Sequence, residues 1–85
     1  MTKYSITITK TAQKQLNKLP NQIADPLIDT ILNLALNPRP VGYIKLKGRN
    51  AYRVRKNKYR IIYEIKDNIL TVTVIAIGHR KEIYK

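Results

Sequence analysis

The sequence predicts an α+β fold: an N-terminal strand, a helical hairpin, then a four-stranded antiparallel meander, forming one sheet with the helices on one face. Residues 3–9 alternate polar and apolar, residues 10–36 carry apolar side chains at helical spacing, and residues 43–78 alternate again between short turn sequences. The 85 residues suffice for one modest core. Residues 1–85 are therefore predicted to form a single domain.

The first two elements follow from the spacing of apolar residues. Residues 3–9 read as a strand that buries one face, made of Tyr4, Ile6 and Ile8. Thr9 suits the N-cap of the next helix, and Pro20 ends that helix. Its core-facing side is expected to carry Ala12, Leu16 and Leu19.

A second helix is expected within residues 21–36, where apolar side chains recur at helical spacing. Pro26 leaves two possibilities: either Asp25 caps the helix and Pro26 is its first residue, or Pro26 sits in a distorted first turn. Asn37-Pro38 ends the helix. Its apolar surface is broader than one contact with a sheet requires, so part of it is expected to receive another helix.

Four further strands complete the predicted sheet. Residues 43–47 are expected to bury Ile44 and Leu46, and residues 51–56 to bury Tyr52 and Val54. Residues 57–66 begin with a turn at Asn57, and their core side should carry Tyr59, Ile61, Tyr63 and Ile65. A two-residue turn at Asp67-Asn68 should lead into residues 69–78, a central strand buried on both faces.

Charge is the unusual property of this chain. Seventeen Lys and Arg face five Asp and Glu, which gives a net charge of +12, and no acidic residue occurs between Arg39 and Arg60. A merely solvated surface usually mixes both signs, so the excess favours a polyanionic partner such as nucleic acid or a ribosome, with an acidic protein or anionic lipid as alternatives. The chain has no cysteine, no signal-peptide pattern and no membrane-length apolar run. We expect a soluble, cytoplasmic protein without membrane association.

Arginines are predicted to gather on the sheet face that the helices leave open. Alternation places Arg53, Arg55 and Arg60 on that face, on adjacent antiparallel strands. Guanidinium groups bind phosphate through paired hydrogen bonds, so such a cluster suits a phosphate. The tail that contains His79, Arg80 and Tyr84 is expected to reach the same face, because its strand pairs with the Arg60 strand.

The remaining side chains point to metal-free RNA cleavage. No pair of carboxylates and no metal-ligand cluster is expected, and Ser5, the only serine, lies on a distant strand. RNA carries its own nucleophile, because its 2′-OH can attack the adjacent phosphate. The predicted catalytic residues are Arg53, Arg55, Arg60 and Arg80 for charge, and His79 and Tyr84 for proton transfer. The predicted RNA contacts are Lys45, Lys47, Arg49, Lys56 and Lys58. No cofactor is expected.

Each of these residues also has a simpler explanation. His79 can be a solvated polar residue, and Tyr84 a packing anchor at the C-terminus. Glu64 suits a salt bridge on the arginine face better than the role of general base. Arg53 and Arg55 can protect a sheet edge from aggregation.

Several segments together resemble the RelE/ParE superfamily of toxin–antitoxin toxins, on the RelE side. They are "LP" between the helices, "NP" after them, "LKG", "AYRVRKNKYRIIYEI" and "GHRKEIY", and they span nearly the whole chain. The resemblance implies a fold of the microbial-ribonuclease type, cleavage of mRNA in the ribosomal A site, and a cognate antitoxin that is acidic in its binding segment. Arg60, Arg80 and Tyr84 match the family's arginines and terminal tyrosine.

One departure from the family bears on the chemistry. Arg53 and Arg55 stand where the best-known member has lysines, and arginine cannot exchange a proton. A proton-transfer role there must fall to another group, for which His79 is the first candidate. Two other functions stay open: non-enzymatic inhibition of DNA gyrase, as in ParE-like toxins, and RNA binding without catalysis.

Overall fold

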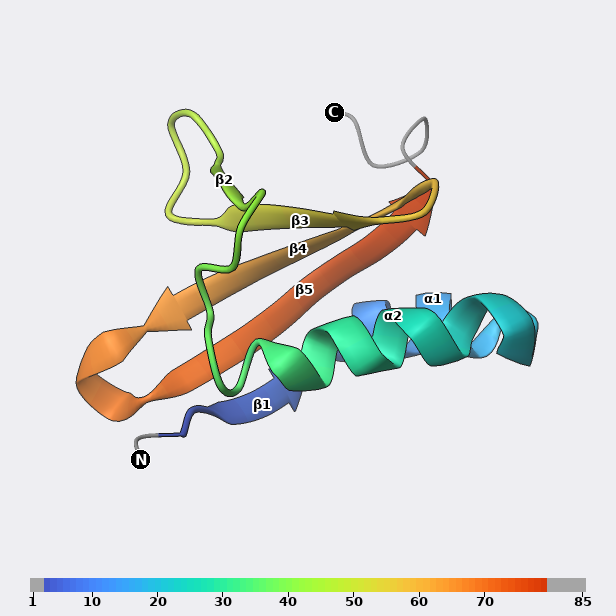
Figure 1. Cartoon of the computed structure of the whole chain (residues 1–85), viewed down its shortest axis with the longest axis horizontal. Helices are drawn as coiled ribbons and strands as arrows, with labels where there is room; N and C mark the ends of the chain where they lie inside the picture. Colours follow the sequence, from blue (N-terminus) through green and yellow to red (C-terminus); the bar gives the residue numbers. More distant parts are fainter. Residues whose placement is uncertain (1–2, 80–85) are drawn as a thin grey trace.

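A computed structural model describes residues 3–79. Its elements follow the order β1 (Ser5–Ile8), α1 (Lys10–Asn17), α2 (Asn21–Asn33), β2 (Ile44–Lys45), β3 (Tyr52–Lys56), β4 (Tyr59–Lys66), a short 3₁₀ turn (Asp67–Ile69) and β5 (Thr71–His79) (Figure 1). The α+β class, the helical hairpin and the order of elements are therefore confirmed.

Helix α1 begins at its predicted N-cap, whereas α2 begins four residues before Asp25. Thr9 caps α1, because its hydroxyl oxygen accepts a hydrogen bond from the backbone N–H of Ala12 at 3.2 Å. Helix α2 begins directly after Pro20 and continues through Pro26, which lies inside the helix. The possibility that α2 starts at Asp25 is therefore wrong. A proline so near the N-terminus removes one backbone hydrogen bond, a loss that the rest of the helix tolerates.

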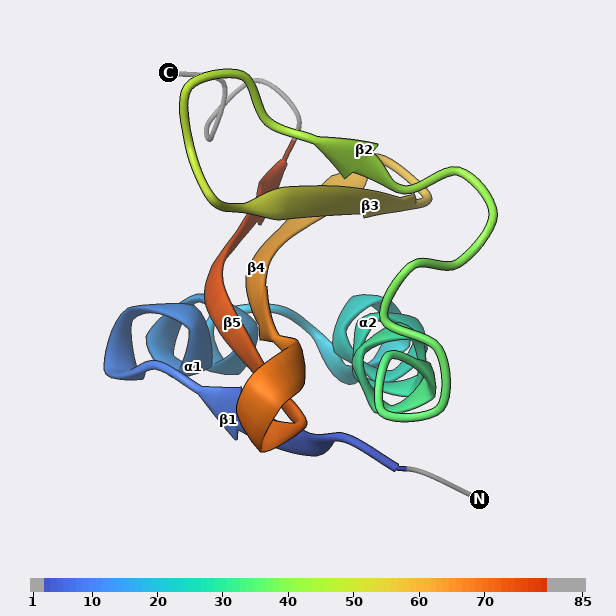
Figure 2. The ribbon, with the colours of Figure 1, turned by 90° about the vertical axis from the view of Figure 1, so that its left-hand side faces the viewer.

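The five strands form one sheet in the order β1-β5-β4-β3-β2, in which β1 runs parallel to β5 and the other neighbours are antiparallel. The predicted meander of β2 to β5 is confirmed. Strand β5 lies inside the sheet as expected, between β1 and β4, but it is fully buried on one face only, and β4 is the middle strand of the five. In Figure 2 the sheet is strongly twisted, so that β3 runs across the direction of β5.

The core lies between the helices and one face of the sheet. Alternate residues of β3, β4 and β5 point into it, including the fully buried Ile61, Tyr63, Val72 and Val74. Leu27 and Ile31 of α2 meet them from the other side. The predicted core positions of Tyr52 and Tyr59 are confirmed, since both rings pack against this cluster.

Two strand predictions need correction. Strand β2 has only two residues, and Ile44, expected to be buried, is 46% exposed. Its register partner is Arg53, so Ile44 lies on the arginine side of the sheet. The turn after β4 spans four residues rather than two, and it ends at Leu70 in a left-handed conformation (φ 49°). Ile69 and Leu70 are consequently exposed turn residues and not part of β5.

Two side-chain contacts tie the segment after α2 to the sheet. Asp67 accepts hydrogen bonds from Arg39 at 2.9 and 3.3 Å and from the Tyr4 hydroxyl at 2.5 Å. The Tyr63 hydroxyl donates to the backbone carbonyl of Pro38 at 2.6 Å, inside the protein. We call residues 37–43 the connecting segment; these bonds hold it against β4 and the turn before β5.

The Arg39–Asp67 contact predicts a small acid sensitivity. Hydrogen bonds from Arg39 and then from Tyr4 hold the pKa of Asp67 below its usual range. The contact therefore stabilises the fold fully when the pH is above the pKa that an aspartate has in the unfolded chain. This stabilisation is lost as pH falls through the lowered pKa of Asp67 in the folded protein. In urea unfolding between pH 6 and pH 2, Asp67→Asn should lose less stability than the wild type. An identical pH dependence for both proteins, with Asp25→Asn as control, would contradict this.

Candidate anion-binding site on the sheet

The open face of the sheet brings two arginines directly opposite each other. The two-residue turn after β3, in which Asn57 takes a positive φ of 58°, pairs Arg55 with Arg60. Directly opposed residues of antiparallel strands point to the same face, so these two side chains project together. Arg53 lies two residues from Arg55 on the same face and pairs with Ile62. The predicted common face for the three arginines is thus confirmed.

Burial distinguishes Arg60 from its neighbour. Arg60 is only 6% exposed, whereas Arg55 is exposed and Arg53 is half-buried. On the other side of Arg60, β5 contributes Gly78, which adds no side chain between the strands and the guanidinium. Charges in a less polar environment interact more strongly with a bound ion than charges in water. A buried arginine beside an exposed one therefore suits an anion that docks from solvent.

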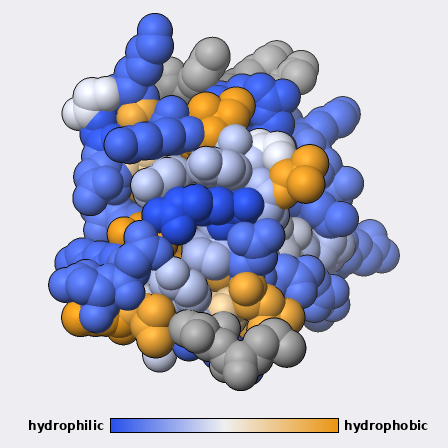
Figure 3. All heavy atoms as spheres, turned by 60° about the vertical axis from the view of Figure 1, so that its left-hand side comes forward, coloured by the Kyte–Doolittle hydropathy of each residue, from blue (hydrophilic) through white to orange (hydrophobic). Residues whose placement is uncertain are grey.

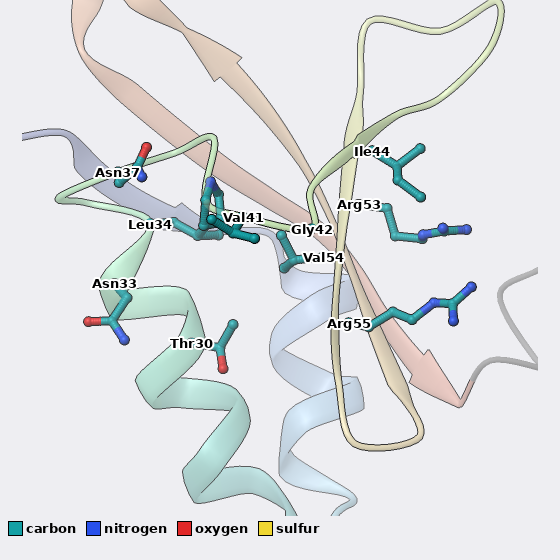
Figure 4. A pocket seen from close by; sticks show the side chains of 11 residues that line it. Thr30, Asn33, Leu34, Asn37, Val41, Gly42, Ile44, Arg53, Val54 and Arg55 are labelled. Atoms are coloured by element: carbon teal, nitrogen blue, oxygen red, sulfur yellow. The ribbon is translucent and has the colours of Figure 1, made fainter.

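A groove of about 620 Å³ runs between α2 and β3 beside the arginines. Thr30, Asn33 and Leu34 line its helical wall, and Val54 lines the strand wall (Figure 4). The side chains of Arg53 and Arg55 point away from the helix in this view, so they reach the groove only at its rim. The groove therefore adjoins the arginine face without being its centre.

His79 lies on the opposite face from Arg60, contrary to expectation. It pairs with Tyr59, whose ring contacts the imidazole edge-on at a centroid distance of 5.6 Å, and it lines a small pocket with Gln15 and Lys18 of helix α1. A β-bulge between Ile62 and Tyr63 produces this placement, because a shift of one residue moves every later side chain to the other face. The expectation that His79 joins the arginine face is wrong.

This placement predicts a mild effect of the substitution His79→Gln. If the protein cleaves RNA, the rate should fall by less than about tenfold, against the roughly 100-fold or greater loss expected when a general acid or base is removed. The rate constant and its pH profile, measured for both proteins, check this. A loss of 100-fold with a changed pH profile would instead show that the imidazole takes part in proton transfer.

The predicted RNA-contact lysines do not share one face. Lys45 pairs with Tyr52, and Lys56 pairs with Tyr59. The side chains of both lysines therefore leave the backbone on the helix side of the sheet, at its margin. Lys47 and Arg49 lie in the exposed turn before β3, and Lys58 lies in the turn after it. Figure 3 shows hydrophilic side chains over much of one surface of the molecule, with smaller apolar groups between them. The five predicted RNA contacts therefore lie in or beside the two turns that flank β3.

Arg80 and Tyr84, both predicted catalytic residues, lie outside the described residues 3–79. Within those residues, no three His, Asp or Glu side chains come together in a way that could hold a metal ion. No described helix is long and apolar enough to cross a membrane.

Sequence reasoning missed three residues around the site. Arg39 was counted only as one of many cations, yet it bonds Asp67 and lies 5.6 Å from the centroid of the Tyr52 ring. Gly78, predicted as the last residue of its strand, pairs with Arg60 and places no side chain beside it. Ile62 is buried although it lies on the arginine face. The pattern of alternation could have flagged Ile62, which interrupts the polar face of its strand.

Comparison with known proteins identifies the family. Residues 6–84 match the family described as ParE toxin of the type II toxin–antitoxin system parDE. The chain therefore belongs to this toxin family, as the sequence resemblance had indicated.

Its relatives place it on the RelE side of that family. It is 30% identical to toxin RelG of Mycobacterium tuberculosis over 96% of this chain and 97% of the relative. It is also 30% identical to toxin RelE of the same organism, over 96% and 87% of the two chains. The protein is thus a RelE-like toxin of a type II system.

Solved structures share the fold. A chain of the RelE–RelB complex from Pyrococcus horikoshii superposes with a TM-score of 0.83 at 27% identity, covering 96% of this chain and 99% of that one. A chain of the toxin–antitoxin complex RelBE2 from Mycobacterium tuberculosis gives a TM-score of 0.82 at 27% identity, covering 92% and 99%. The single sheet with two helices is therefore the fold of these RelE toxins.

Proposed function

We propose that this toxin is a ribosome-dependent mRNA endonuclease that works in the cytoplasm and needs no metal ion. The observation that carries the proposal is the pairing of the exposed Arg55 with the buried Arg60 on the open face of the sheet, beside Gly78. Two guanidinium groups in this arrangement suit a phosphate that gains negative charge in the transition state.

The proposed reaction uses a nucleophile from the substrate. The 2′-oxygen of RNA attacks the adjacent phosphorus as it loses its proton to a base, the bond from phosphorus to the 5′-oxygen breaks, and an acid protonates that oxygen. The products are a 2′,3′-cyclic phosphate and a 5′-hydroxyl. Arg53, Arg55 and Arg60 stabilise the phosphate, and DNA, which lacks the 2′-OH, is not cleaved.

Proton transfer is assigned to the C-terminal residues. In this proposal Arg80 adds positive charge, and Tyr84 exchanges the proton, because a phenol can release a proton whereas arginine holds its own. His79 faces Tyr59, so in this proposal it supports the end of β5 and takes no part in proton transfer.

The proposed partners are mRNA, the ribosome and a cognate antitoxin. The net charge of +12 suits docking on ribosomal RNA, with affinity that falls steeply as salt rises. The antitoxin is proposed from the relatives, because structures of RelE-like toxins from Pyrococcus horikoshii and Mycobacterium tuberculosis are toxin–antitoxin complexes.

Programmed ribosomes test the proposal. The purified toxin is incubated with ribosomes that carry a defined mRNA, with and without EDTA, and the 5′ ends of the fragments are mapped. Cuts within the A-site codon that persist in EDTA are expected. Intact mRNA together with inhibition of gyrase in a supercoiling assay would replace the proposal by a ParE-like function. Binding without cuts would indicate an RNA-binding module.

A further inference from the structure

The side chains on the open face of the sheet lie in rows that cross the strands. Residues that are paired in register point to the same face, so each row can be followed from one strand to the next. The first row is the cationic one, in which Arg55 pairs with Arg60. In the next row along β4 and β5, Ile62 pairs with Ala76, and neither side chain can form a hydrogen bond. The arginine row is therefore followed by an apolar one.

A carboxylate begins the third row. Glu64 lies two residues beyond Ile62 on β4 and pairs with Thr73 of β5. Thr73 pairs in turn with Thr7 of the parallel strand β1. Glu64 is half-buried, and it is the only acidic residue within residues 30–66. One carboxylate and two hydroxyl groups are therefore aligned on the same face as the arginines.

Glu64 is not used to neutralise a neighbouring cation. The salt bridge predicted for it is not formed within residues 3–79, where the ion pair joins Arg39 to Asp67 instead. Arg53 lies one row away from Glu64 towards the cationic row, and Lys66 lies one row away on the other side. A carboxylate that has cations nearby but no ion pair keeps its acceptor oxygens available for a ligand.

The spacing of the rows suits one nucleotide. Strand residues rise about 3.3 Å each, so Arg60 and Glu64 leave the backbone of β4 roughly 13 Å apart. A phosphate bound by the arginines has its ribose and base attached, and a base that extends along β4 crosses the apolar row. Its far edge then meets the carboxylate row. Sequence in single-stranded RNA is read by hydrogen bonds to such base edges.

The chemistry of a carboxylate distinguishes among the four bases. An ionised carboxylate only accepts hydrogen bonds, and its two oxygens can accept two parallel N–H donors. Guanine alone presents two adjacent donors on its Watson–Crick edge, N1–H and the 2-amino group. Adenine, cytosine and uracil each have an acceptor atom next to their donor, and a carboxylate repels that atom.

We propose that Glu64 selects guanine as the base next to the phosphate that Arg55 and Arg60 bind. The hydroxyl of Thr73, directly opposite Glu64, suits the 6-oxygen of guanine, which accepts a hydrogen bond. This inference rests on the proposed function for the arginine-bound phosphate. It adds a division of roles on the sheet, because contacts to phosphate position any nucleotide, whereas contacts to a base edge specify one.

A base analogue tests the role of Glu64. Programmed ribosomes carry codons that differ only in the bases flanking the mapped cut, and one set contains inosine, which is guanine without the 2-amino group. At one flanking position the wild type should cleave beside guanine about tenfold faster than beside the other bases. Inosine there should lower the rate by about fivefold to tenfold, the loss of one charge-assisted hydrogen bond. Glu64→Ala should remove both differences.

Two further variants make the test specific. Glu64→Gln keeps the size of the side chain but turns one acceptor into a donor. Its amide can donate to N1 of adenine and accept from the 6-amino group, so this variant should prefer adenine to guanine. Asp29→Asn, the matched control, removes a negative charge from α2 and should keep the guanine preference. No guanine preference in the wild type, an unchanged preference in Glu64→Ala, or an equal loss at every codon would overturn the inference.

Binding of an uncleavable RNA separates this inference from the proposed function. A short RNA with methyl groups on its 2′-oxygens cannot react by the proposed route, and its affinity for the purified toxin is measured with guanine or inosine at each position. Cleavage on ribosomes without a base preference would overturn only the role of Glu64. A guanine preference in binding that Glu64→Ala abolishes, without cleavage by the wild type, would overturn only the nuclease.

Discussion

Replacing Arg60 with alanine is expected to lower the rate of mRNA cleavage by about 100-fold to 1,000-fold, the loss typical of removing one preorganised group from a developing charge. Arg60 is 6% exposed and faces Arg55 across the strands. Water screens its guanidinium less than the other cations, so it should stabilise the transition-state phosphate most. Single-turnover cleavage on programmed ribosomes measures the effect.

Because Arg60 is buried, its alanine variant can also lose stability, and three controls separate the two effects. Arg60→Lys keeps the charge but not the two-pronged hydrogen bonding, so it should recover only part of the rate. Arg60→Met fills the space without charge and should be as slow as alanine. Lys14→Ala removes an exposed cation from α1 and should leave the rate unchanged. Equal rates for Arg60→Met and the wild type would show that the charge of Arg60 has no part in the reaction.

The arginine face could be predicted from sequence because local rules determine it. The turn at Asn57 has two residues, and a turn of that length determines the register of its hairpin. Alternation then places Arg55 and Arg60 opposite each other whatever the rest of the chain does. The core tyrosines follow from the same rule.

The position of His79 could not be predicted, because it depends on counting residues across a longer turn and a bulge. The turn before β5 keeps four residues, and the bulge near Ile62 then adds one residue to β5. Without that bulge, His79 would project on the same face as Arg60; with it, Ile77 enters the core and His79 follows to the helix side. In the structure the bulge appears as two buried residues of β5, Val74 and Ile77, that are three residues apart; in the sequence residues 74–77 are all apolar and hide this spacing.

The connecting segment is also beyond sequence rules, because its bonds join residues far apart in the chain. Arg39 and Asp67 are 28 residues apart, and Tyr4 and Asp67 are 63 apart. No periodicity links such positions. These bonds matter to the site because they hold the connecting segment in place, and Pro40 and Val41 of this segment line the groove beside Arg53.

Replacing Tyr63 with phenylalanine is expected to destabilise the fold by about 1–3 kcal/mol at neutral pH, the usual cost of leaving a buried polar group without its partner. Tyr63 is fully buried, and its hydroxyl donates to the carbonyl of Pro38 at 2.6 Å. Its ring also lies 5.9 Å from the ring of Tyr52, a contact that phenylalanine preserves. The loss therefore reports on the hydrogen bond. Urea unfolding of both proteins, with the exposed Tyr43→Phe as control, measures it.

The stabilities of the wild type and Tyr63→Phe should become more similar at alkaline pH. Burial raises the pKa of Tyr63 to about 12, above that of a tyrosine in the unfolded chain. The contribution of the Tyr63 hydroxyl to the free energy of unfolding is therefore complete below about pH 10. It is lost as pH rises from about 10 towards 12, because in this range the tyrosine gives up its proton only in the unfolded chain. Tyr63→Phe has no proton to lose there, so the stability gap between the two proteins should narrow between about pH 10 and pH 12. A gap that stays constant over this range would show that the Tyr63 hydroxyl is open to water rather than held on Pro38.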